Sequence, residues 1–547
     1  MPLAAVPIVF ALTVRAADAD AIAISANIQA RHLPWGTIVD PFYASATSDT
    51  ITGYTRCGDS AIWTGHYLAA ESFRYAVTRA PEALAAATAA IDSLRGLVNV
   101  TGSGLLARCR IAIGSPFADG IHREEAANGV FTNNNAGYTW IGNPSRDQYL
   151  GAVFGLGVAY ELIPERRAAI RDTVTAIVDP LVASDWNPRG GPTFILRPDQ
   201  VLGILQVARL ANRERFGEIY AAQRARLAGS VSTPIAFDSL STSSYFKFNL
   251  IHITFYHLVR HEEPESRGVY ERAFAIARNY TAGHQNAFFN MVDAALFGID
   301  TRRDAETLAL LDLWLKRPRR DFFVDLRTTV RVCGDQACDP IPVDRRTPTD
   351  FLWQRNPFQL SGGGAGTIGN AGIDYILPYW MARYYGVAPA FAAQAAAPDA
   401  IELYHGYTYS GHASAAVAAS VVKPVAKVEL SPTSPTAGLS VQVTAAGSTA
   451  GTGRSLVGYA WSLKDGGGVV TGFSTATNAA TAAFTPSAAG TVVVQVTVTD
   501  DLGVQATAEL SIVVAAAPIT PPTPTPSKSG GGSMSVLWLA ARWGAAW

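Results

Sequence analysis

Two aspartates at the starts of helical patterns, Asp59 and Asp147, have the residue type and placement for acid–base chemistry. A pair of carboxyl groups can cleave a glycosidic bond, because one protonates the leaving oxygen while the other activates water or attacks the sugar. A separation of about 5 Å leads to retention of configuration, and about 6.5–9.5 Å to inversion. We predict these two residues as catalytic acid and partner, with Glu124 as a third candidate acid.

Asp59 precedes a segment with helical spacing, and Trp63 and His66 follow it four and seven residues later. These offsets place the three side chains on one face of a helix. An acid, an indole and an imidazole at a helix start could line a sugar site, so Trp63 and His66 are predicted substrate contacts. The structural alternative is that Asp59 is an N-cap and Trp63 packs in the core.

Ser145 and Gln148 flank Asp147 in the pattern of a capping box, with Ser145 as the N-cap and Gln148 as the third helical residue. Asp147 then lies in the first turn of a helix. Its structural alternative is a favourable interaction with the helix dipole.

A long polar and aromatic connection over residues 101–144 shows little helical pattern. Connections of that length without regular structure are usually functional or disordered. This one contains Glu124, Tyr138, Trp140 and an asparagine run. Flat aromatic rings stack on sugar faces and amides bind hydroxyl groups, so Tyr138 and Trp140 are predicted to contact substrate.

A further cluster lies in the helical segment 244–263, where Asn249, His252 and Tyr256 share a face and Tyr245 lies one turn before Asn249. These residue types resemble those of toroidal polysaccharide lyases, which neutralise a uronate carboxylate with Asn or Arg and use Tyr and His as base and acid. The resemblance makes Asn249 and His252 candidate substrate contacts. A single helical histidine, however, more often packs in the core.

Aromatic residues and arginines are abundant between Trp314 and Gly386. Trp353 and Arg355 are predicted substrate contacts in this stretch. Further candidates are Asp374, Tyr375 and Tyr379. Three arginines could bind an anionic glycan, or could bridge Asp321 and Asp325 within the protein: Arg317, Arg319 and Arg320.

Composition and missing motifs exclude several function classes. The net charge is -1 and only 16% of residues are charged, so no basic excess indicates a nucleic-acid partner. No GxSxG, HExxH or Rossmann fingerprint occurs, which leaves serine hydrolases, zinc proteases and dehydrogenases without support. We expect neither a metal nor a cofactor.

The chain has four cysteines, and an even number in an exported protein favours disulfides over free thiols. Cys333 and Cys338 would close a tight polar loop. Cys57 and Cys109 bracket the first helical hairpin, so a bond between them would hold its open end.

Residues 20–420 carry apolar residues at helical spacing, interrupted by Pro, Gly and Asn. The segments come in pairs: 59–79 with 81–100, 145–163 with 164–182, 198–213 with 216–228, 244–260 with 264–280, and 286–297 with 304–316. A last helix near 369–385 could pair with an early one near 20–31. No fixed-period repeat occurs, which disfavours a solenoid. In architecture the pattern resembles the (α/α)6 toroid of many glycoside hydrolases and polysaccharide lyases.

Short alternating runs separated by turn residues follow from about residue 421 and predict an all-β sandwich. The segments YAW at 459–461 and VTVTDDLG at 496–503 resemble PKD-type immunoglobulin-like domains, over roughly residues 423–515. The resemblance implies that Trp461 is the core tryptophan. It also implies an accessory module that acts as a spacer or as a weak glycan binder.

Both ends of the chain carry patterns of protein export. Residues 3–14 form an apolar stretch of signal-peptide length, followed by A-x-A spacing. The C-terminal Pro/Thr segment leads to a Gly/Ser hinge and a short apolar segment with Arg542. This resembles the GlyGly-type sorting tails of Gram-negative bacteria, and implies transient membrane association through the tail and cleavage by a sorting protease.

The sequence thus predicts a multidomain protein: an all-α (α/α)6 toroid followed by a small all-β immunoglobulin-like sandwich. The expected parts are a signal-peptide-like segment (1–19), the toroid (20–420), the PKD-like sandwich (421–515), a linker (516–533) and a sorting-tail-like segment (534–547). We expect a bacterial glycoside hydrolase, secreted or at the cell surface, acting on a polysaccharide or oligosaccharide. The alternatives are a polysaccharide lyase and a non-catalytic glycan-binding protein.

Overall fold

The computed structural model describes residues 17–188, 194, 196–348, 350–388, 402–403, 407–408, 424–450, 455–500 and 505–517. The chain divides into two compact units, one containing the helices and the other containing most of the C-terminal β region. None of the described helices combines the length and the apolar character needed to cross a membrane. The segments 1–16 and 518–547, with most of the predicted signal segment, most of the linker and the tail, lie outside the described residues.

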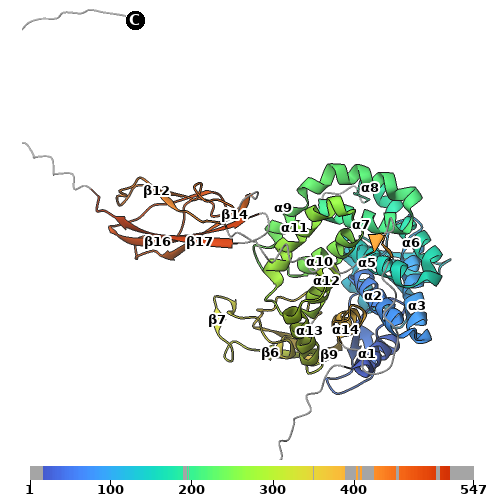
Figure 1. Cartoon of the computed structure of the whole chain (residues 1–547). Helices are drawn as coiled ribbons and strands as arrows, with labels where there is room; N and C mark the ends of the chain where they lie inside the picture. The colour runs from blue at the N-terminus through green and yellow to red at the C-terminus, as the bar shows by residue number, and fades with distance from the viewer. Residues whose placement is uncertain are drawn as a thin grey trace, which may run out of the picture. The chain divides into compact units, whose positions relative to one another are not determined.

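Helices dominate the first unit (Figure 1). They are α1 (Asp18–Arg31), α2 (Ser60–Thr78), α3 (Pro81–Asn99), α4 (Ala118–Glu124), α5 (Arg146–Leu162), α6 (Arg167–Ala183), α7 (Pro198–Ala211), α8 (Arg213–Leu227), α9 (Ser232–Asp238), α10 (Phe246–Arg260), α11 (Pro264–Thr281), α12 (Ala287–Phe297), α13 (Thr301–Trp314) and α14 (Ile373–Tyr384). The predicted helix pairs are confirmed to within a few residues. Prolines begin α3, α7 and α11, as predicted from their preference for the first helical position.

Six of these helices contact one another in a closed order, α14–α2–α5–α7–α10–α12 and back to α14. Each also contacts a partner outside this circuit: α3 against α2, α6 against α5, α8 against α7, α11 against α10, α13 against α12, and α1 against α14. Helices α2, α5 and α10 are buried over most of their length. A helix buried in this way carries apolar residues on nearly all of its faces.

Glycines bring α2 and α5 into backbone contact. A Cβ atom on Gly65 would lie 1.9 Å from the carbonyl oxygen of Gly151, and one on Gly155 would lie 2.1 Å from the carbonyl oxygen of Gly65. These distances are far inside van der Waals contact, so only glycine fits. This close approach places the start of α2, with Asp59, beside the start of α5, with Asp147.

We expect Gly65→Ala to lower the free energy of unfolding by about 1–3 kcal/mol, the usual range for an overpacked core. The added methyl group would have to displace the backbone of α5. Thermal denaturation measures the loss. Gly217→Ala is the matched control, since its Cβ would meet only Arg213 at 3.7 Å and alanine is favoured within a helix. An unchanged melting temperature for Gly65→Ala would contradict the packing described here.

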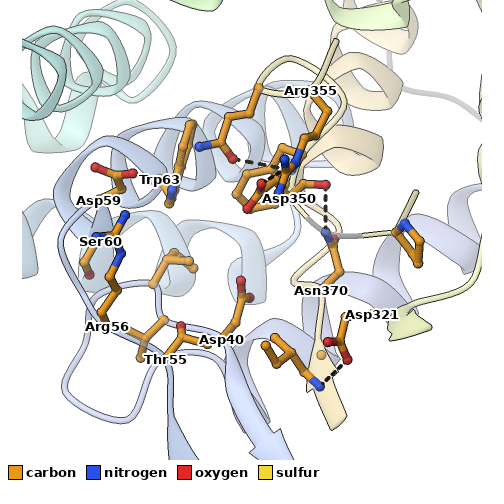
Figure 2. Close-up of a pocket in the computed structure, with 17 residues that line it drawn as sticks. Asp40, Thr55, Arg56, Asp59, Ser60, Trp63, Asp321, Asp350, Arg355 and Asn370 are labelled. Carbon is orange, nitrogen blue, oxygen red and sulfur yellow. Dashed lines mark hydrogen bonds and ion pairs between the residues drawn. The ribbon is translucent and has the colours of Figure 1, made fainter. Parts of the chain in front are cut away.

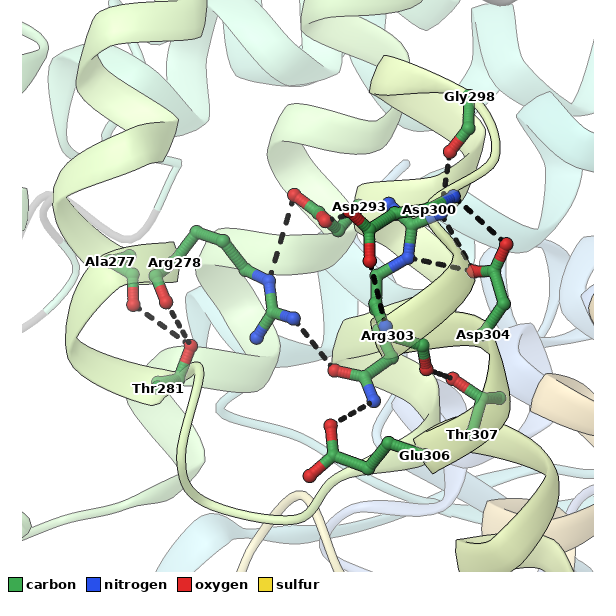
Figure 3. A network of polar contacts seen from close by, with 11 residues as sticks. Ala277, Arg278, Thr281, Asp293, Gly298, Asp300, Arg303, Asp304, Glu306 and Thr307 are labelled. Atoms are coloured by element: carbon green, nitrogen blue, oxygen red, sulfur yellow. Dashed lines mark hydrogen bonds and ion pairs between the residues drawn. The ribbon is translucent and has the colours of Figure 1, made fainter. Parts of the chain in front are cut away.

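Largely buried charges tie α11, α12 and α13 together (Figure 3). The guanidinium of Arg303 donates to Asp293 at 2.9 Å and to Asp304 at 2.8 Å. Arg278 of α11 lies 3.6 Å from the same Asp293 and donates to Asn290 at 2.7 Å. Because Asp293 pairs with arginines from two helices, the network fixes the α12–α13 hairpin against α11.

Several small sheets lie among the helices. β1 (Pro41–Tyr43), β2 (Ile51–Tyr54), β6 (Arg320–Asp325) and β9 (Ser361–Gly369) form one sheet in the order β2-β1-β9-β6, and β3 (Cys109–Ala112), β4 (Val130–Asn133) and β5 (Tyr138–Ile141) form another in the order β3-β5-β4. Short two-stranded pairs are β7 (Val332–Cys333) with β8 (Gln336–Ala337), and β10 (Glu402–Leu403) with β11 (Tyr407–Thr408). The expectation of an all-helical part missed these strands, because they are short or rich in glycine and show no clear alternation.

The C-terminal region forms two three-stranded sheets. One has the order β12 (Glu429–Ser431), β13 (Val441–Thr444), β15 (Thr481–Phe484), and the other β14 (Leu456–Asp465), β16 (Gly490–Asp500), β17 (Gln505–Val514). Every second residue of β16 from Val492 to Val498 is fully buried, as expected for a strand with one face in a core. Trp461 is 5% exposed and donates from Nε1 to the carbonyl oxygen of Ala479. The predicted strands of this region are therefore confirmed.

Candidate active site

Two adjoining cavities lie at the start of α2, and the starts of α5 and α10 line the smaller one. The larger has a volume of about 320 Å³ and is drawn in Figure 2, and the smaller has about 250 Å³. Four residues line both: Arg56, Asp59, Trp63 and Gln354. Asp147 and Asn249 line the smaller cavity. The two aspartates proposed from the sequence as acid and partner therefore face the same space.

Asp59 is the N-cap residue of α2, but its side chain forms no capping hydrogen bond with that helix. Its Oδ1 instead accepts a hydrogen bond from Nε2 of Gln148 at 3.1 Å. The same nitrogen donates to the carbonyl oxygen of Gly58 at 3.1 Å. The carboxylate is thus held by a side chain of the neighbouring helix start and faces the cavities.

Asp147 lies in the first turn of α5, where the predicted capping box is confirmed. The Oγ of Ser145 accepts from the backbone N–H of Asp147, and Oε1 of Gln148 accepts from the N–H of Ser145 at 2.6 Å. Gln148 therefore uses its oxygen to complete the capping box and its nitrogen to hold Asp59. This one side chain couples the positions of the two carboxyl groups.

Both carboxyl groups have a pKa above the ordinary value for aspartate. Burial raises the pKa of Asp59, while Arg108 and Arg56 oppose this shift. Burial also raises the pKa of Asp147; Arg146 lowers it, and the charge of Asp59 raises it. The charge of Asp59 therefore favours the protonated form of Asp147.

The segment 350–355 forms part of the wall of the larger cavity (Figure 2). Nε of Arg355 lies 2.6 Å from Oδ2 of Asp350 in an ion pair. The ring of Phe351 meets Trp63 edge-on, with 4.9 Å between ring centroids. Arg355, a predicted substrate contact, thus lines the cavity with its charge paired to Asp350.

A buried ion pair holds this segment in place. Nη1 of Arg317 lies 3.2 Å from Oδ2 of Asp374, and both side chains are almost inaccessible to solvent. Nη2 of Arg317 donates to the carbonyl oxygens of Thr347 and Asp350 at 2.8 and 3.2 Å. Oδ2 of Asp374 also accepts from the backbone N–H of Leu352 at 2.9 Å. The Arg317–Asp374 pair therefore holds the backbone of the segment that forms this part of the cavity wall.

The three arginines considered as an anion site all bind within the protein. Arg317 pairs with Asp374, Arg319 donates to the carbonyl oxygen of Asn370 at 3.0 Å, and Arg320 pairs with Asp49 at 3.0 Å. The alternative prediction, in which these arginines bridge Asp321 and Asp325, is wrong about the partners. Asp325 pairs with Arg327, and Asp321 accepts from the backbone N–H of Ile368.

The polar residues of the larger cavity that were not proposed as site residues from the sequence include Asp40, Arg56, Asp321, Asp350 and Asn370. Arg56 stands three residues before Asp59, which was the available signal for it. The others lie in loops and at strand ends of β1, β6 and β9, where no local pattern marks a binding residue.

Asn249 and His66 meet at the smaller cavity. Nε2 of His66 lies 3.1 Å from the side-chain amide of Asn249, and Nδ1 lies 2.9 Å from the carbonyl oxygen of Ile62. His66 is fully buried, whereas Trp63 is partly exposed and lines both cavities. Of the two predicted contacts on α2, Trp63 therefore faces the cavities and His66 lies behind Asn249.

The residues considered for a lyase do not come together. His252 is fully buried and stacks on Phe289 with 3.9 Å between ring centroids. Tyr256 hydrogen-bonds Tyr385, and Tyr245 hydrogen-bonds His284. None of these three predicted residues lines either cavity, in contrast to Asn249.

Trp353 is also fully buried. Its ring packs against His66 at 4.9 Å and Phe288 at 5.1 Å between centroids. The candidates Tyr375 and Tyr379 are buried as well. Their burial leaves no ring face for a sugar, so these aromatic residues support the site from within the core.

The third candidate acid, Glu124, lies at the exposed end of α4 and lines neither cavity. Its neighbour Glu125 is the buried one, at 1% exposure, and its charge raises the pKa of Asp59. A Cβ atom on Gly58 would lie 2.9 Å from Oε1 of Glu125. Glu124 therefore lies away from both cavities, and the sequence did not reveal that Glu125 is the glutamate that turns inward.

Tyr138 and Trp140 lie on β5 in the sheet formed by the long connection. Phe131 of β4 pairs with Trp140 directly across the strands, and their rings stack with centroids 4.5 Å apart. Tyr138 is covered by the guanidinium of Arg110, 4.5 Å from its ring centroid. Phe131 is 48% exposed, so it offers the open aromatic face of this pair.

This sheet is connected to the catalytic candidates through Arg108. Its Nη1 donates to the carbonyl oxygen of Gly58 at 2.9 Å, and its Nε donates to that of Asn143 at 2.9 Å. The predicted disulfide between Cys57 and Cys109 is present and makes a second link between the same segments. The predicted disulfide between Cys333 and Cys338 is present as well.

Glu161, His257 and His261 are close enough together to hold a metal ion. Arg260 lies within 2.8 and 3.0 Å of the two carboxylate oxygens of Glu161, and Nε2 of His261 lies 2.7 Å from Oε1. A guanidinium in that position competes with a cation, so the arrangement favours a buried ion-pair cluster over a metal site.

No family model matches the chain, and no curated protein matches it. Over 18% of its length the chain is similar to the whole PKD1 domain of Vibrio anguillarum Epp, with 30% identity and a TM-score of 0.14. Over 17% it is similar to 99% of the PKD1 domain from the Vibrio cholerae metalloprotease PrtV, with 28% identity and a TM-score of 0.14. Over 49% it is similar to 69% of a nucleoside hydrolase-related hypothetical protein from Saccharophagus degradans that is associated with carbohydrate metabolism, with 14% identity and a TM-score of 0.16.

Proposed function

We propose that this protein is a secreted glycoside hydrolase in which Asp147 and Asp59 are the catalytic carboxyl groups. The observation that carries the proposal is that both side chains line one cavity, from the starts of neighbouring helices, with pKa values raised by burial. Glycoside hydrolysis requires such a pair. The closed circuit of six helices, each with an outer partner, supports the assignment of this part as an (α/α)6 toroid.

The surroundings of the two acids suggest different roles. Asp59 accepts a hydrogen bond from Gln148 and has Arg56 and Arg108 nearby, all of which favour its charged form. The pKa of Asp147 is lowered mainly by Arg146, whose Nε lies 3.6 Å from its Oδ1, and is raised by the charge of Asp59. Asp147 is therefore the general acid that protonates the leaving oxygen, and Asp59 is the carboxylate that activates water or attacks the sugar.

The substrate proposed is a neutral polysaccharide or oligosaccharide. Four carboxylates line the larger cavity, those of Asp40, Asp59, Asp321 and Asp350, against two guanidinium groups. An excess of negative charge repels a polyanionic glycan, whereas carboxylates accept hydrogen bonds readily from sugar hydroxyl groups. The partly exposed ring of Trp63 offers an apolar face for a sugar ring.

The experiment is a turnover assay on a panel of neutral and uronate-containing glycans. New reducing ends without absorbance of an unsaturated uronate would support a hydrolase, and such absorbance would establish the second candidate, a polysaccharide lyase. The second candidate rests on Asn249, which lines the smaller cavity and would have to offer its NH2 group to a uronate carboxylate. Binding of a glycan without turnover would leave the third possibility, a non-catalytic glycan-binding protein.

The remaining parts fit an extracellular protein. Both disulfides are typical of oxidising compartments, and PKD domains are typical of extracellular proteins. We propose that the C-terminal β region is a PKD-like, immunoglobulin-like sandwich that serves as a spacer. The signal peptide, the GlyGly-type tail with its sorting protease, and an origin at a Gram-negative cell surface remain predictions from the sequence.

We expect Phe131→Ala to raise KM for long glycans about threefold to tenfold and to leave kcat unchanged. The ring would stack on a sugar beyond the cavities, and aromatic stacking contributes about 0.5–1.5 kcal/mol. Steady-state kinetics on a series of chain lengths measures this. Phe237→Ala removes another exposed phenylalanine, on α9, and is the control. An equal effect of both variants, or none on long chains, would contradict a stacking role for Phe131.

A further inference from the structure

The hydrogen bonds of His66 determine which of its nitrogens carries a proton. Nδ1 lies 2.9 Å from the carbonyl oxygen of Ile62, one turn earlier in α2. A carbonyl oxygen can only accept, so Nδ1 carries a hydrogen and donates it. A neutral imidazole has one N–H group, and Nε2 then offers a lone pair to the side-chain amide of Asn249, 3.1 Å away.

The surroundings of His66 keep the imidazole neutral. The side chain is fully buried, and its ring meets those of Trp63, Phe154, Phe288 and Trp353 at centroid distances of 4.9–6.0 Å. This apolar cage offers no carboxylate partner for an imidazolium, and burial lowers the pKa of His66 to about 4. At neutral pH, Nε2 is therefore an acceptor.

A lone pair on Nε2 requires a donor from Asn249. The two ends of a side-chain amide have nearly the same shape, and their identity follows from the hydrogen bonds that they make. As placed in the structure, Oδ1 of Asn249 lies 3.1 Å from Nε2, so two lone pairs face each other and the buried Nδ2 lacks a partner among the described residues. Exchanging the two ends of the amide gives both nitrogens a partner and leaves the oxygen at the other end of this fully buried side chain, which lines the smaller cavity.

We infer that Asn249 presents its amide oxygen, and not its NH2 group, to the cavity lined by Asp59 and Asp147, with neutral His66 holding this orientation. Asn249 then accepts a hydrogen bond from a sugar hydroxyl group or from the attacking water. It cannot neutralise a uronate carboxylate, because both groups are acceptors. This substrate preference rests on the proposed function and favours a glycan with a free hydroxyl group at this position over a uronate-containing one.

Two variants of Asn249 test the direction of the hydrogen bond. In Asn249→Asp, the carboxylate and His66 share an added proton, and the second oxygen still accepts from substrate. Asn249→Leu keeps the approximate volume and removes the acceptor. We expect kcat/KM to be about 10-fold lower for Asn249→Leu than for Asn249→Asp on the glycan that the parent protein turns over. The reverse order would show that an acceptor at this position does not help turnover and would overturn the inference.

A measurement that does not depend on turnover separates this inference from the proposed function. The ¹⁵N spectrum of histidine-labelled full-length protein at neutral pH should show His66 with a protonated Nδ1 and an unprotonated Nε2, identified by its loss in His66→Gln. Asn249→Asp should convert this signal to the doubly protonated form. A His66 that is cationic in the parent, or protonated on Nε2, overturns the inference even if glycans are hydrolysed. If no glycan is turned over, the hydrolase proposal fails while the tautomer result still stands.

Discussion

Replacing Asp147 with asparagine is expected to lower kcat by about 10²–10⁴-fold while the protein still folds. The loss is that of a positioned general acid, because an amide cannot protonate the leaving oxygen. Asparagine keeps the shape of the side chain and its place in the first turn of α5, where Ser145 and Gln148 form the capping box. Initial rates on the glycan identified in the panel measure the loss, and melting curves verify the fold.

The same substitution should change how stability depends on pH. The folded-state pKa of Asp147 is raised, so at a pH between the unfolded and folded values the folded protein binds more protons. The stability of the parent therefore falls as pH rises through this range, which begins at the ordinary pKa of aspartate. The Asp147→Asn variant does not lose stability in this way, because asparagine does not titrate. Its stability relative to the parent should increase as pH rises and then level off above the folded-state pKa.

Two comparisons make the result decisive. Asp172→Asn, on α6, removes an exposed carboxylate and should change neither rate nor pH profile. Asp59→Asn should lower kcat to a similar extent as Asp147→Asn, but should remove the acidic limb of the pH–rate profile, because the base is lost instead of the acid. Full turnover by Asp147→Asn would refute the assignment.

The helical part of the fold was predictable because local signals agree with one another. Apolar spacing gave the helices, and Pro81, Pro198 and Pro264 marked three of their starts. The capping box at Ser145 fixed the register of α5, and with it the place of Asp147 in the first turn. These features depend on residues within one or two turns of each other, so the sequence displays them directly.

The cavity wall was less predictable because it is assembled from distant segments. Asp350 and Asn370 line the same cavity as Asp59 although they are distant from it in the sequence, and a linear sequence does not show that the following helix, α14, packs beside α2. A helical face also does not say what covers it. His66 and His252 were predicted on polar faces, but neighbouring helices bury both, and Glu124 differs from the buried Glu125 by a single residue.

The second large effect is expected from Asp374→Asn, behind the cavity wall. Burial raises the pKa of Asp374 and lowers that of Arg317, which means that both groups are held charged against the preference of their surroundings. Removing one charge leaves the other buried without compensation, and this usually lowers the free energy of unfolding by about 3–5 kcal/mol. Denaturant unfolding of the full chain measures the loss.

A double variant separates stability from the positioning of the wall. Arg317→Met combined with Asp374→Leu removes both buried charges, and apolar replacements of an ion pair are often neutral or stabilising. We expect this variant to recover most of the lost stability. It should nevertheless keep a low kcat/KM, because the carbonyl oxygens of Thr347 and Asp350 lose the guanidinium that holds segment 350–355 against Trp63. Recovery of activity together with stability would show that this segment keeps its place without Arg317, and that the pair contributes to folding alone.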